Sequence, residues 1–267
     1  MLSPRRQAPW PRDVEHGVGP LQRLGLAGVA VHDCLALYLR VVLGRERLDL
    51  PALAAAVRQS GLSVLPALTL ISLAIGAILG AQTESFLGRF DLPGLVLLSV
   101  GYTVSVEIAP ILAGILVAGR AGVALAVRQA TMLASEELDG LLVCGIDPVQ
   151  FTLAPALLAM LLLSFAFAIW SALMAFVAAG VWLWAQAGVP PALFLDALRA
   201  SFEPGDLLAA FLKPPVFALI IALIATVNGN LAGRDPLGAS RAATRTMIGA
   251  VTAILLADLL FVLARQG

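Results

Sequence analysis

Five long apolar segments constrain this sequence of 267 residues more than any other feature. They cover residues 63–82, 95–119, 151–185, 207–231 and 246–264. The hydrocarbon core of a bilayer is about 30 Å thick, so a helix that rises ~1.5 Å per residue needs about 20 mostly apolar residues to cross it. All five segments have roughly that length or more. The pattern therefore predicts an all-α integral membrane protein with about five transmembrane helices.

The overall composition also fits lipid as the solvent. Hydrophobic residues make up 60% of the chain and charged residues 13%, whereas soluble domains have about 45–50% apolar and roughly 25% charged residues. Aromatic residues make up only 6%, and no alternating segments of about ten residues recur, which argues against a transmembrane β-barrel.

The third apolar segment, residues 151–185, has no charged residue over 35 positions. As a helix it would be ~52 Å long, well beyond the thickness of the hydrocarbon core. We expect one long or bent helix that extends past the membrane. Two short spans are the alternative, and each would be barely long enough.

The N-terminal region differs from the rest of the chain. Residues 1–20 form a polar tail, and residues 21–62 mix apolar residues with repeated arginines. This mixture predicts amphipathic helices that lie in the membrane interface, with arginines that reach toward the headgroups. A small cytosolic helical hairpin is the alternative. Residues 63–267 then form the transmembrane domain.

Basic residues gather on one side of the predicted spans. Of the 17 basic residues, thirteen lie on that side. Eight of these are arginines that precede residue 63, and the other five are Arg120, Arg128, Arg234, Arg241 and Arg245. Because cytoplasmic loops carry an excess of Lys and Arg, we expect a cytoplasmic N-terminus and, after five spans, a C-terminus on the opposite side.

The sequence lacks the residues that most catalytic sites need. Its one lysine, Lys213, is not part of a Gly-Lys-Ser/Thr phosphate-binding motif. The two histidines, His16 and His32, precede the spans, and the two cysteines, Cys34 and Cys144, lie far apart. We therefore expect no catalytic residue, no metal site and no cofactor in this chain. Energy for transport would come from a gradient or from another subunit.

Three ionisable residues lie inside the apolar segments: Glu107, Lys213 and Asp258. Gradient-driven carriers keep such residues near the middle of the membrane to bind a coupling ion. One hypothesis is therefore a stand-alone, gradient-driven carrier or channel for a hydrophobic solute. The apolar character of the rest of the spans favours an amphiphilic substrate over a hydrophilic one.

A short acidic segment, SEELDGL at residues 135–141, interrupts the apolar pattern. Its carboxylates belong to Glu136, Glu137 and Asp139. Ser135 is a suitable N-cap for a short helix, and the first two acids would lie in its first turn, where they favour the helix dipole. Leu138 and Leu141 would share one face. Two interpretations stay open: the acids only stabilise the helix start, or the helix docks on a soluble partner.

Three blocks of the sequence resemble the MlaE-type permease family. They read EIAPILAGILVAGRAGVALAV, TMLASEELDGLLVCGIDPVQF and GASRAATRTMIGAVTAILLADLLF. Members of this family are membrane subunits of ABC transporters that work with MCE proteins to move phospholipid between bacterial membranes. The resemblance implies that residues 63–267 are a permease domain, that the protein lies in the bacterial inner membrane and that its C-terminus is periplasmic.

The resemblance also implies partners. A permease of this type forms a homodimer and pairs with a separate ABC ATPase, which binds ATP and Mg, and with a periplasmic MCE protein. Whether a small STAS-domain protein joins the assembly stays open, and no nucleic acid is expected. The segment SEELDGL matches the part of the family that contacts the ATPase. The expected coupling residues are Ser135, Glu136, Glu137, Leu138, Asp139 and Leu141.

The same resemblance places Glu107 at a lipid-binding cavity, because EIAP matches a Glu-Leu-Gly-Pro motif of the family. If the first span continues as a helix past residue 82, then Phe86, Leu87 and Phe90 share a face, and Leu79 lies two turns below. These five residues are the expected lipid-binding set. The alternative is that the phenylalanines are interfacial anchors and that Glu107 makes an interhelical contact.

The sequence departs from the family pattern at three positions. Arg128 stands where members usually carry Glu, Glu137 replaces the usual Gln, and Val106 stands where an Arg often precedes the Glu-Leu-Gly-Pro motif. These differences indicate a divergent subfamily with its own ATPase and MCE partner.

Overall fold

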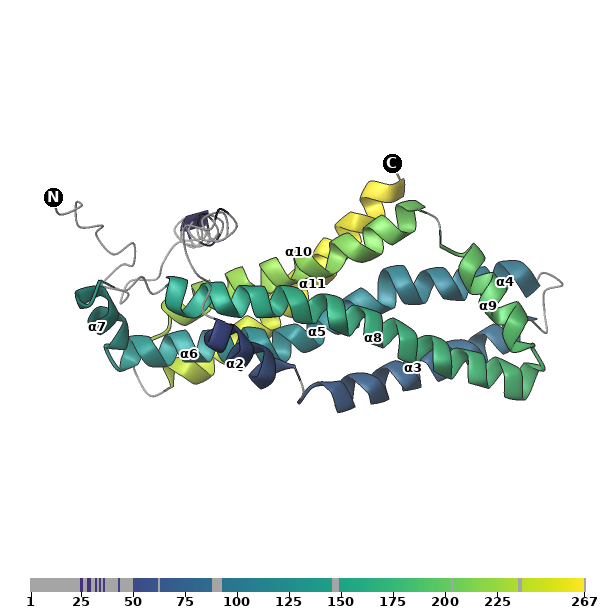
Figure 1. Cartoon of the computed structure of the whole chain (residues 1–267), viewed down its shortest axis with the longest axis horizontal. Helices are drawn as coiled ribbons and strands as arrows, with labels where there is room; N and C mark the ends of the chain where they lie inside the picture. Colours follow the sequence, from purple (N-terminus) through teal and green to yellow (C-terminus); the bar gives the residue numbers. More distant parts are fainter. Residues whose placement is uncertain are drawn as a thin grey trace. The chain divides into compact units, whose positions relative to one another are not determined.

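The structure is a computed structural model that describes residues 50–61, 63–87, 93–145, 149–202, 204–234 and 237–266, with isolated residues between 25 and 43. All regular structure in these residues is helical, so the predicted all-α class is confirmed. The helices (Figure 1) are α2 (Leu50–Ser60), α3 (Leu65–Leu87), α4 (Pro93–Tyr102), η1 (Thr103–Ile108), α5 (Ala109–Val117), η2 (Ala118–Gly122), α6 (Val123–Ala134), α7 (Glu137–Val143), η3 (Val149–Leu153), α8 (Ala154–Ala187), α9 (Pro191–Ala200), α10 (Pro204–Asn230) and α11 (Gly238–Gln266).

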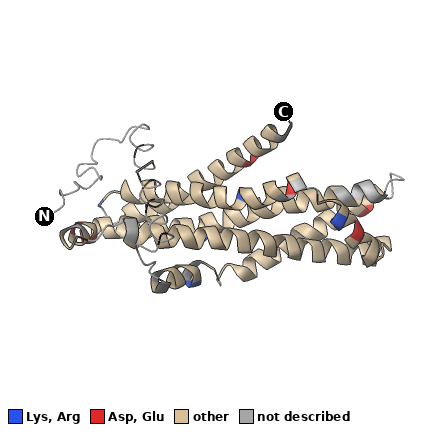
Figure 2. Cartoon of the chain, turned by 45° about the horizontal axis from the view of Figure 1, so that its top comes forward, with Lys and Arg blue, Asp and Glu red and all other residues tan. Residues whose placement is uncertain are grey.

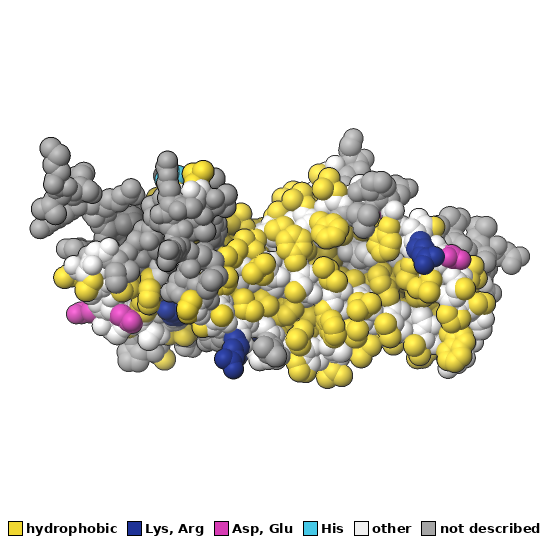
Figure 3. Space-filling view, viewed as in Figure 1, with side chains coloured by type: hydrophobic (Ala, Val, Ile, Leu, Met, Phe, Trp, Pro, Cys, Tyr) yellow, Lys and Arg dark blue, Asp and Glu magenta, His cyan; other side chains and the backbone are white. Residues whose placement is uncertain are grey.

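Five helical stretches in the described part of the chain are long and apolar enough to cross a membrane. They are Leu65–Leu87, Ser99–Ala134, Phe151–Ala187, Leu208–Asn230 and Gly238–Ala264. Charged side chains are sparse along these helices (Figure 2), and hydrophobic side chains cover much of their outer surface (Figure 3). The five predicted spans are confirmed, and the long third segment forms one span.

The chain divides into two compact units. Unit 1 contains the residues up to Arg58, Ala118–Met160 and Leu219–Val251. Unit 2 contains Gln59–Val117, Leu161–Ala218 and the residues from Thr252 onward. In the N-terminal region, α2 is helical as predicted. The polar tail and most of residues 21–49 lie outside the described residues, and the interfacial location stays a prediction.

Two stretches that lie between the predicted spans are helical. Helix α9 lies between the predicted third and fourth spans, and α11 begins at Gly238, well before the predicted start of the fifth span. Helix α9 begins at Pro191, whose missing N–H costs nothing in a first turn. Its Phe194 and Leu198 are one turn apart and are buried with Leu97 of α4 and Leu183 of α8. This small core holds α9 in unit 2.

Helices α3 and α8 pack closely in unit 2, where they lie side by side (Figure 1). The hydroxyls of Ser72 and Ser171 form a buried hydrogen bond of 2.9 Å. One turn further on, a methyl group at Gly76 would collide with the carbonyl oxygen of Ala175. Small residues allow membrane helices to approach this closely. The contact between Ser72, Gly76 and Gly80 of α3 and their α8 partners is called the α3–α8 seam below.

The second span is not a regular helix. It contains two π-helical stretches, η1 and η2. Pro110 lies just after η1, and its missing N–H removes one backbone hydrogen bond from a regular helix. π-Helical turns of this kind often occur at functional sites. Glu107, one of the predicted lipid-binding residues, lies in η1.

Candidate functional site

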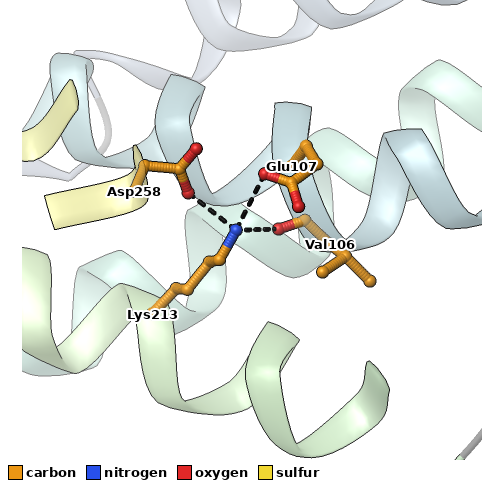
Figure 4. Close-up of polar contacts among 4 residues, drawn as sticks. All are labelled: Val106, Glu107, Lys213 and Asp258. Atoms are coloured by element: carbon orange, nitrogen blue, oxygen red, sulfur yellow. Dashed lines mark hydrogen bonds and ion pairs between the residues drawn. The ribbon is translucent and has the colours of Figure 1, made fainter. Parts of the chain in front are cut away.

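A buried group of three charged residues lies within unit 2 (Figure 4). Lys213 of α10 places its Nζ 2.9 Å from Glu107 Oε2 and 2.7 Å from Asp258 Oδ1. The same Nζ donates a hydrogen bond of 2.9 Å to the backbone oxygen of Val106. The Asp258 contact lacks hydrogen-bond geometry, so it is an ion pair. Glu107, Lys213 and Asp258 are called the ion cluster below.

The local sequence explains why Lys213 finds a carbonyl group here. In a regular helix, the N–H of residue 110 would donate to the oxygen of residue 106. Residue 110 is a proline and has no N–H. The Val106 oxygen therefore lacks that donor, and the ammonium group of Lys213 donates to it instead. The ion cluster thus joins three elements of unit 2: η1, α10 and α11.

The side chains of the ion cluster differ in their access to the surroundings. The Lys213 side chain is 1% exposed, that of Asp258 is 11% exposed and that of Glu107 is 24% exposed. A buried charge needs a partner, because its desolvation otherwise costs several kcal/mol. Lys213 has two carboxylates and a carbonyl oxygen as partners. It is therefore held in place at a depth where an isolated cation would be unstable.

Four of the five predicted lipid-binding residues are described, and all four lie in unit 2. Leu79 packs against Val100 and Val104 in one buried cluster, and Leu87 packs against a second cluster around Leu97. Phe86 is 48% exposed on α3, and Phe90 lies outside the described residues. The helix does continue through residue 87, as the prediction requires. The structure thus brings Leu79 near the η1 segment, whereas Leu87 packs in a different cluster.

The predicted lipid-binding set omitted two members of the ion cluster. The sequence suggested Lys213 and Asp258 only as residues that could bind a coupling ion. In the structure, Lys213 forms ion pairs with both Glu107 and Asp258. The signal in the sequence was available, because each is an ionisable residue inside an apolar span. Which spans are neighbours cannot be read from that pattern.

The acidic segment lies in unit 1, where it begins just after α6 and continues through most of α7. The prediction that Ser135 is the N-cap of the acidic helix was wrong. Its N–H and its hydroxyl both donate to the Thr131 oxygen, at 2.9 and 3.0 Å, so Ser135 ends α6. Glu136 has φ of +59° and directly precedes α7. The first turn of α7 contains Glu137 and Asp139, so the predicted place in the first turn is right for Glu137 and wrong for Glu136. Both Glu137 and Asp139 lie where the helix dipole favours a negative charge.

The side chains of the acidic segment divide into a buried and an exposed set. Leu138 is buried and Leu141 is partly buried, whereas all three acids are exposed. The exposed set has one basic neighbour in the loop after α10. The Arg234 guanidinium lies 4.0 Å from Glu136 and 3.8 Å from Asp139. These distances are at the limit of an ion pair.

Arg128, which stands where the resembling family usually has an acid, lies on α6 in unit 1. Its guanidinium lies 5.4 Å from the centre of the Phe151 ring, close enough for a cation–π interaction. The adjacent Gln129 is buried, and its side chain fills the space that a methyl group on Gly229 would need. The Arg–Gln pair therefore has a packing role within this chain.

Comparisons with known proteins show which family the chain belongs to. The model of the permease MlaE family matches residues 53–264. The chain is 29% identical over 219 residues to the intermembrane phospholipid transport system permease protein MlaE of Haemophilus influenzae, covering 78% of this chain and 80% of that protein. It is 25% identical over 200 residues to a probable ABC transporter permease protein of Rickettsia prowazekii, covering 75% and 77%. It is also 29% identical over 157 residues to the chloroplastic protein TRIGALACTOSYLDIACYLGLYCEROL 1 of Arabidopsis thaliana, covering 57% of this chain and 43% of that protein. Because the family match includes all five spans, the ion cluster and the acidic segment, the chain belongs to the MlaE permease family.

Proposed function

We propose that this chain is the permease subunit of an ABC transporter that moves phospholipid between the bacterial inner membrane and an MCE-protein partner. The family is one of membrane transport subunits rather than enzymes. The name of the Haemophilus relative specifies phospholipid as the cargo. A separate chain would bind ATP and Mg and hydrolyse ATP, because the one lysine here is buried in the ion cluster.

The observation that carries the proposal is that α7 exposes acidic side chains in a chain whose spans are otherwise apolar. Helix α7 presents Glu137 and Asp139 to solvent while Leu138 holds it against unit 1. A cytoplasmic ATPase with basic residues at its contact would complement this surface. The proposed complex contains two copies of this chain, because ABC ATPases act in pairs and each would need a permease surface.

Charge reversal tests the ATPase contact. In the double variant Glu136→Lys/Glu137→Lys, we expect loss of ATPase binding, since losing a desolvated interfacial charge pair costs about 2–5 kcal/mol. The measurement is a pull-down of the ATPase encoded in the same operon, from membranes that express both chains. The matched control is Asp196→Lys on α9, which is similarly exposed and should leave the pull-down unchanged. Unchanged binding in the double variant would mean that the acids do not contact the ATPase and only stabilise the start of α7.

Photocrosslinking tests the lipid site. Among the described members of the predicted set, Phe86 is exposed, so a crosslinker there should label phospholipid strongly. Leu162 on α8 is exposed to a similar degree and is the control for contact with bulk bilayer. Equal labelling at both positions would mean that Phe86 only touches the bilayer.

A gradient-driven carrier is the rival function, and the ion cluster is its basis. Reconstitution of this chain into liposomes without any ATPase separates the two. We expect no net phospholipid movement under an imposed proton gradient. Gradient-dependent movement that is lost on Glu107→Gln would favour the carrier.

A further inference from the structure

The ion cluster contains one carboxylate more than it contains cations. Lys213 can neutralise one of its two acidic partners, Glu107 and Asp258. Within the candidate spans of unit 2, which cover residues 65–87, 99–117, 161–187, 208–218 and 252–264, the other charged residue is Glu84, which is also acidic. The residue before Glu107 is Val106, which is apolar and buried. The described membrane part of unit 2 therefore offers negative charge and no spare cation.

The excess charge is accessible at one side chain. Lys213 and Asp258 are almost enclosed, whereas about a quarter of the Glu107 side chain is exposed. One Glu107 oxygen, Oε2, receives the Lys213 ammonium group, so the carboxylate still has acceptor capacity. A ligand that reaches the ion cluster would thus meet the Glu107 carboxylate first.

We propose that Glu107 is a specificity-determining residue that selects phospholipids whose headgroup carries a primary amine, such as phosphatidylethanolamine. This inference rests on the proposed function, because it takes phospholipid as the cargo. It adds the sign and the hydrogen-bonding chemistry of the headgroup that the ion cluster accepts.

The chemistry of the carboxylate discriminates between three headgroup classes. A primary ammonium group carries a positive charge and donates three hydrogen bonds, as a lysine side chain does. A quaternary ammonium group, as in phosphatidylcholine, carries the charge but has no N–H to donate. An anionic headgroup such as glycerol phosphate brings only negative charge to a site that already has an excess of it. Charge-assisted hydrogen bonds are the stronger kind, so the expected order is amine, then choline, then anionic headgroup.

A competition experiment tests the order. The full-length chain is purified and exchanged into vesicles of equimolar phosphatidylethanolamine, phosphatidylcholine and phosphatidylglycerol, and the lipids that stay bound are identified by native mass spectrometry. We expect bound phosphatidylethanolamine to exceed phosphatidylglycerol on the order of tenfold relative to the bulk vesicle, which corresponds to about 1.4 kcal/mol.

Three variants assign the preference to Glu107. Glu107→Gln leaves one lysine and one aspartate, a balanced pair, so this variant should fold and should lose the amine preference. Glu107→Asp keeps the charge and should keep a preference for the amine. Glu84→Gln is the matched control, because it makes the same carboxylate-to-amide change at a site where Trp182 Nε1 donates to the side-chain oxygen, and it should not alter the bound headgroups.

The outcomes separate this inference from the proposed function. Phospholipid bound in the same proportions as in the vesicle, or enriched in phosphatidylglycerol, would overturn the amine preference and leave phospholipid transport intact. A Glu107→Gln variant that keeps the preference would also overturn it. No specifically bound phospholipid in any variant would overturn the proposed function itself.

Discussion

Two charged regions of this permease, the ion cluster and the acidic segment, differ in the exposure of their side chains and in the distances between their charged groups. In the ion cluster of unit 2, charged atoms approach to 2.7–2.9 Å, and the lysine side chain is 1% exposed. Around the acidic segment of unit 1, the nearest pairs are 3.8–4.0 Å apart, and the side chains of Arg234, Glu136 and Asp139 are 51%, 73% and 58% exposed. The charged groups of the ion cluster are therefore paired with one another inside unit 2, whereas those of the acidic segment are mostly exposed.

The difference follows from the dielectric surroundings. Exposed ion pairs contribute about 0–1 kcal/mol, because water and salt screen them. Breaking a buried pair by removing one partner costs about 3–5 kcal/mol, because the remaining charge is left without a counterion. A charge that must stay available to a partner protein therefore belongs in an exposed setting such as the acidic segment. A charge that organises helices within the membrane belongs in a buried setting such as the ion cluster.

The strongest test of this contrast removes the lysine. Lys213→Met leaves two carboxylates without their cation, the buried Asp258 and the partly buried Glu107. It also removes the donor to the Val106 oxygen. We expect a loss of about 3–5 kcal/mol in the free energy of unfolding, measured by denaturant titration in detergent micelles.

A compensated variant distinguishes charge from packing. Lys213→Met/Glu107→Gln/Asp258→Asn has no charge in the ion cluster, and replacing a whole buried ion pair by uncharged residues is often neutral for stability. We expect most of the lost stability to return. If the triple variant is as unstable as Lys213→Met, the shape of the lysine side chain matters more than its charge.

The next largest effect comes from an uncharged contact in unit 2. Gly76→Ala places a methyl group against the backbone of Ala175, so α3 must move away from α8. Overpacking of this kind costs about 1–3 kcal/mol. The control is Gly140→Ala in α7, where nothing lies within 4 Å of the added carbon. Alanine favours a helix over glycine by about 1 kcal/mol, so the control should be neutral or stabilising in the same denaturant titration.

The sequence predicted the spans well, because their physics is local. A run of about 20 apolar residues has few alternatives to a membrane helix. The same rule says nothing about α9, a short helix between the third and fourth spans. The helical spacing of Phe194 and Leu198 was present, but its meaning depends on Leu97 and Leu183, which come from other helices.

The candidate sites show the same division between local and non-local information. The exposure of the acids in α7 could be predicted from their residue types. The identity of the helix-ending residue could not, because Ser135 is a good N-cap but α6 binds its N–H and hydroxyl first. Glutamate at positive φ costs roughly 1–2 kcal/mol, so no sequence rule would have chosen Glu136 for that conformation. Each member of the ion cluster was visible in the sequence, whereas their meeting required the packing of η1, α10 and α11.

A contact of intermediate exposure provides a smaller effect. Trp182 of α8 donates a hydrogen bond of 2.9 Å from Nε1 to Oε2 of Glu84, which lies on α3 one turn after Gly80 of the α3–α8 seam. Trp182→Phe removes the donor and keeps an aromatic ring. We expect a loss of about 0.5–1.5 kcal/mol, the usual net value of one hydrogen bond, in the same denaturant titration. If Trp182→Phe lowers the free energy of unfolding as much as Lys213→Met does, the contrast between buried and exposed charges does not hold for Glu84.

The smallest effect on stability should come from Arg234→Gln, although Arg234 approaches two acids. Both contacts are long and the guanidinium is half exposed, so we expect a change of less than about 0.5 kcal/mol in the free energy of unfolding. Added salt should reduce even this change, since the Debye length falls from ~10 Å at 0.1 M to ~3 Å at 1 M. The same variant should strengthen ATPase binding slightly, because Arg234 offsets part of the negative charge that the partner would meet at Glu136 and Asp139. Weaker binding in the pull-down would instead mean that Arg234 itself contacts the ATPase or orients the acids for it.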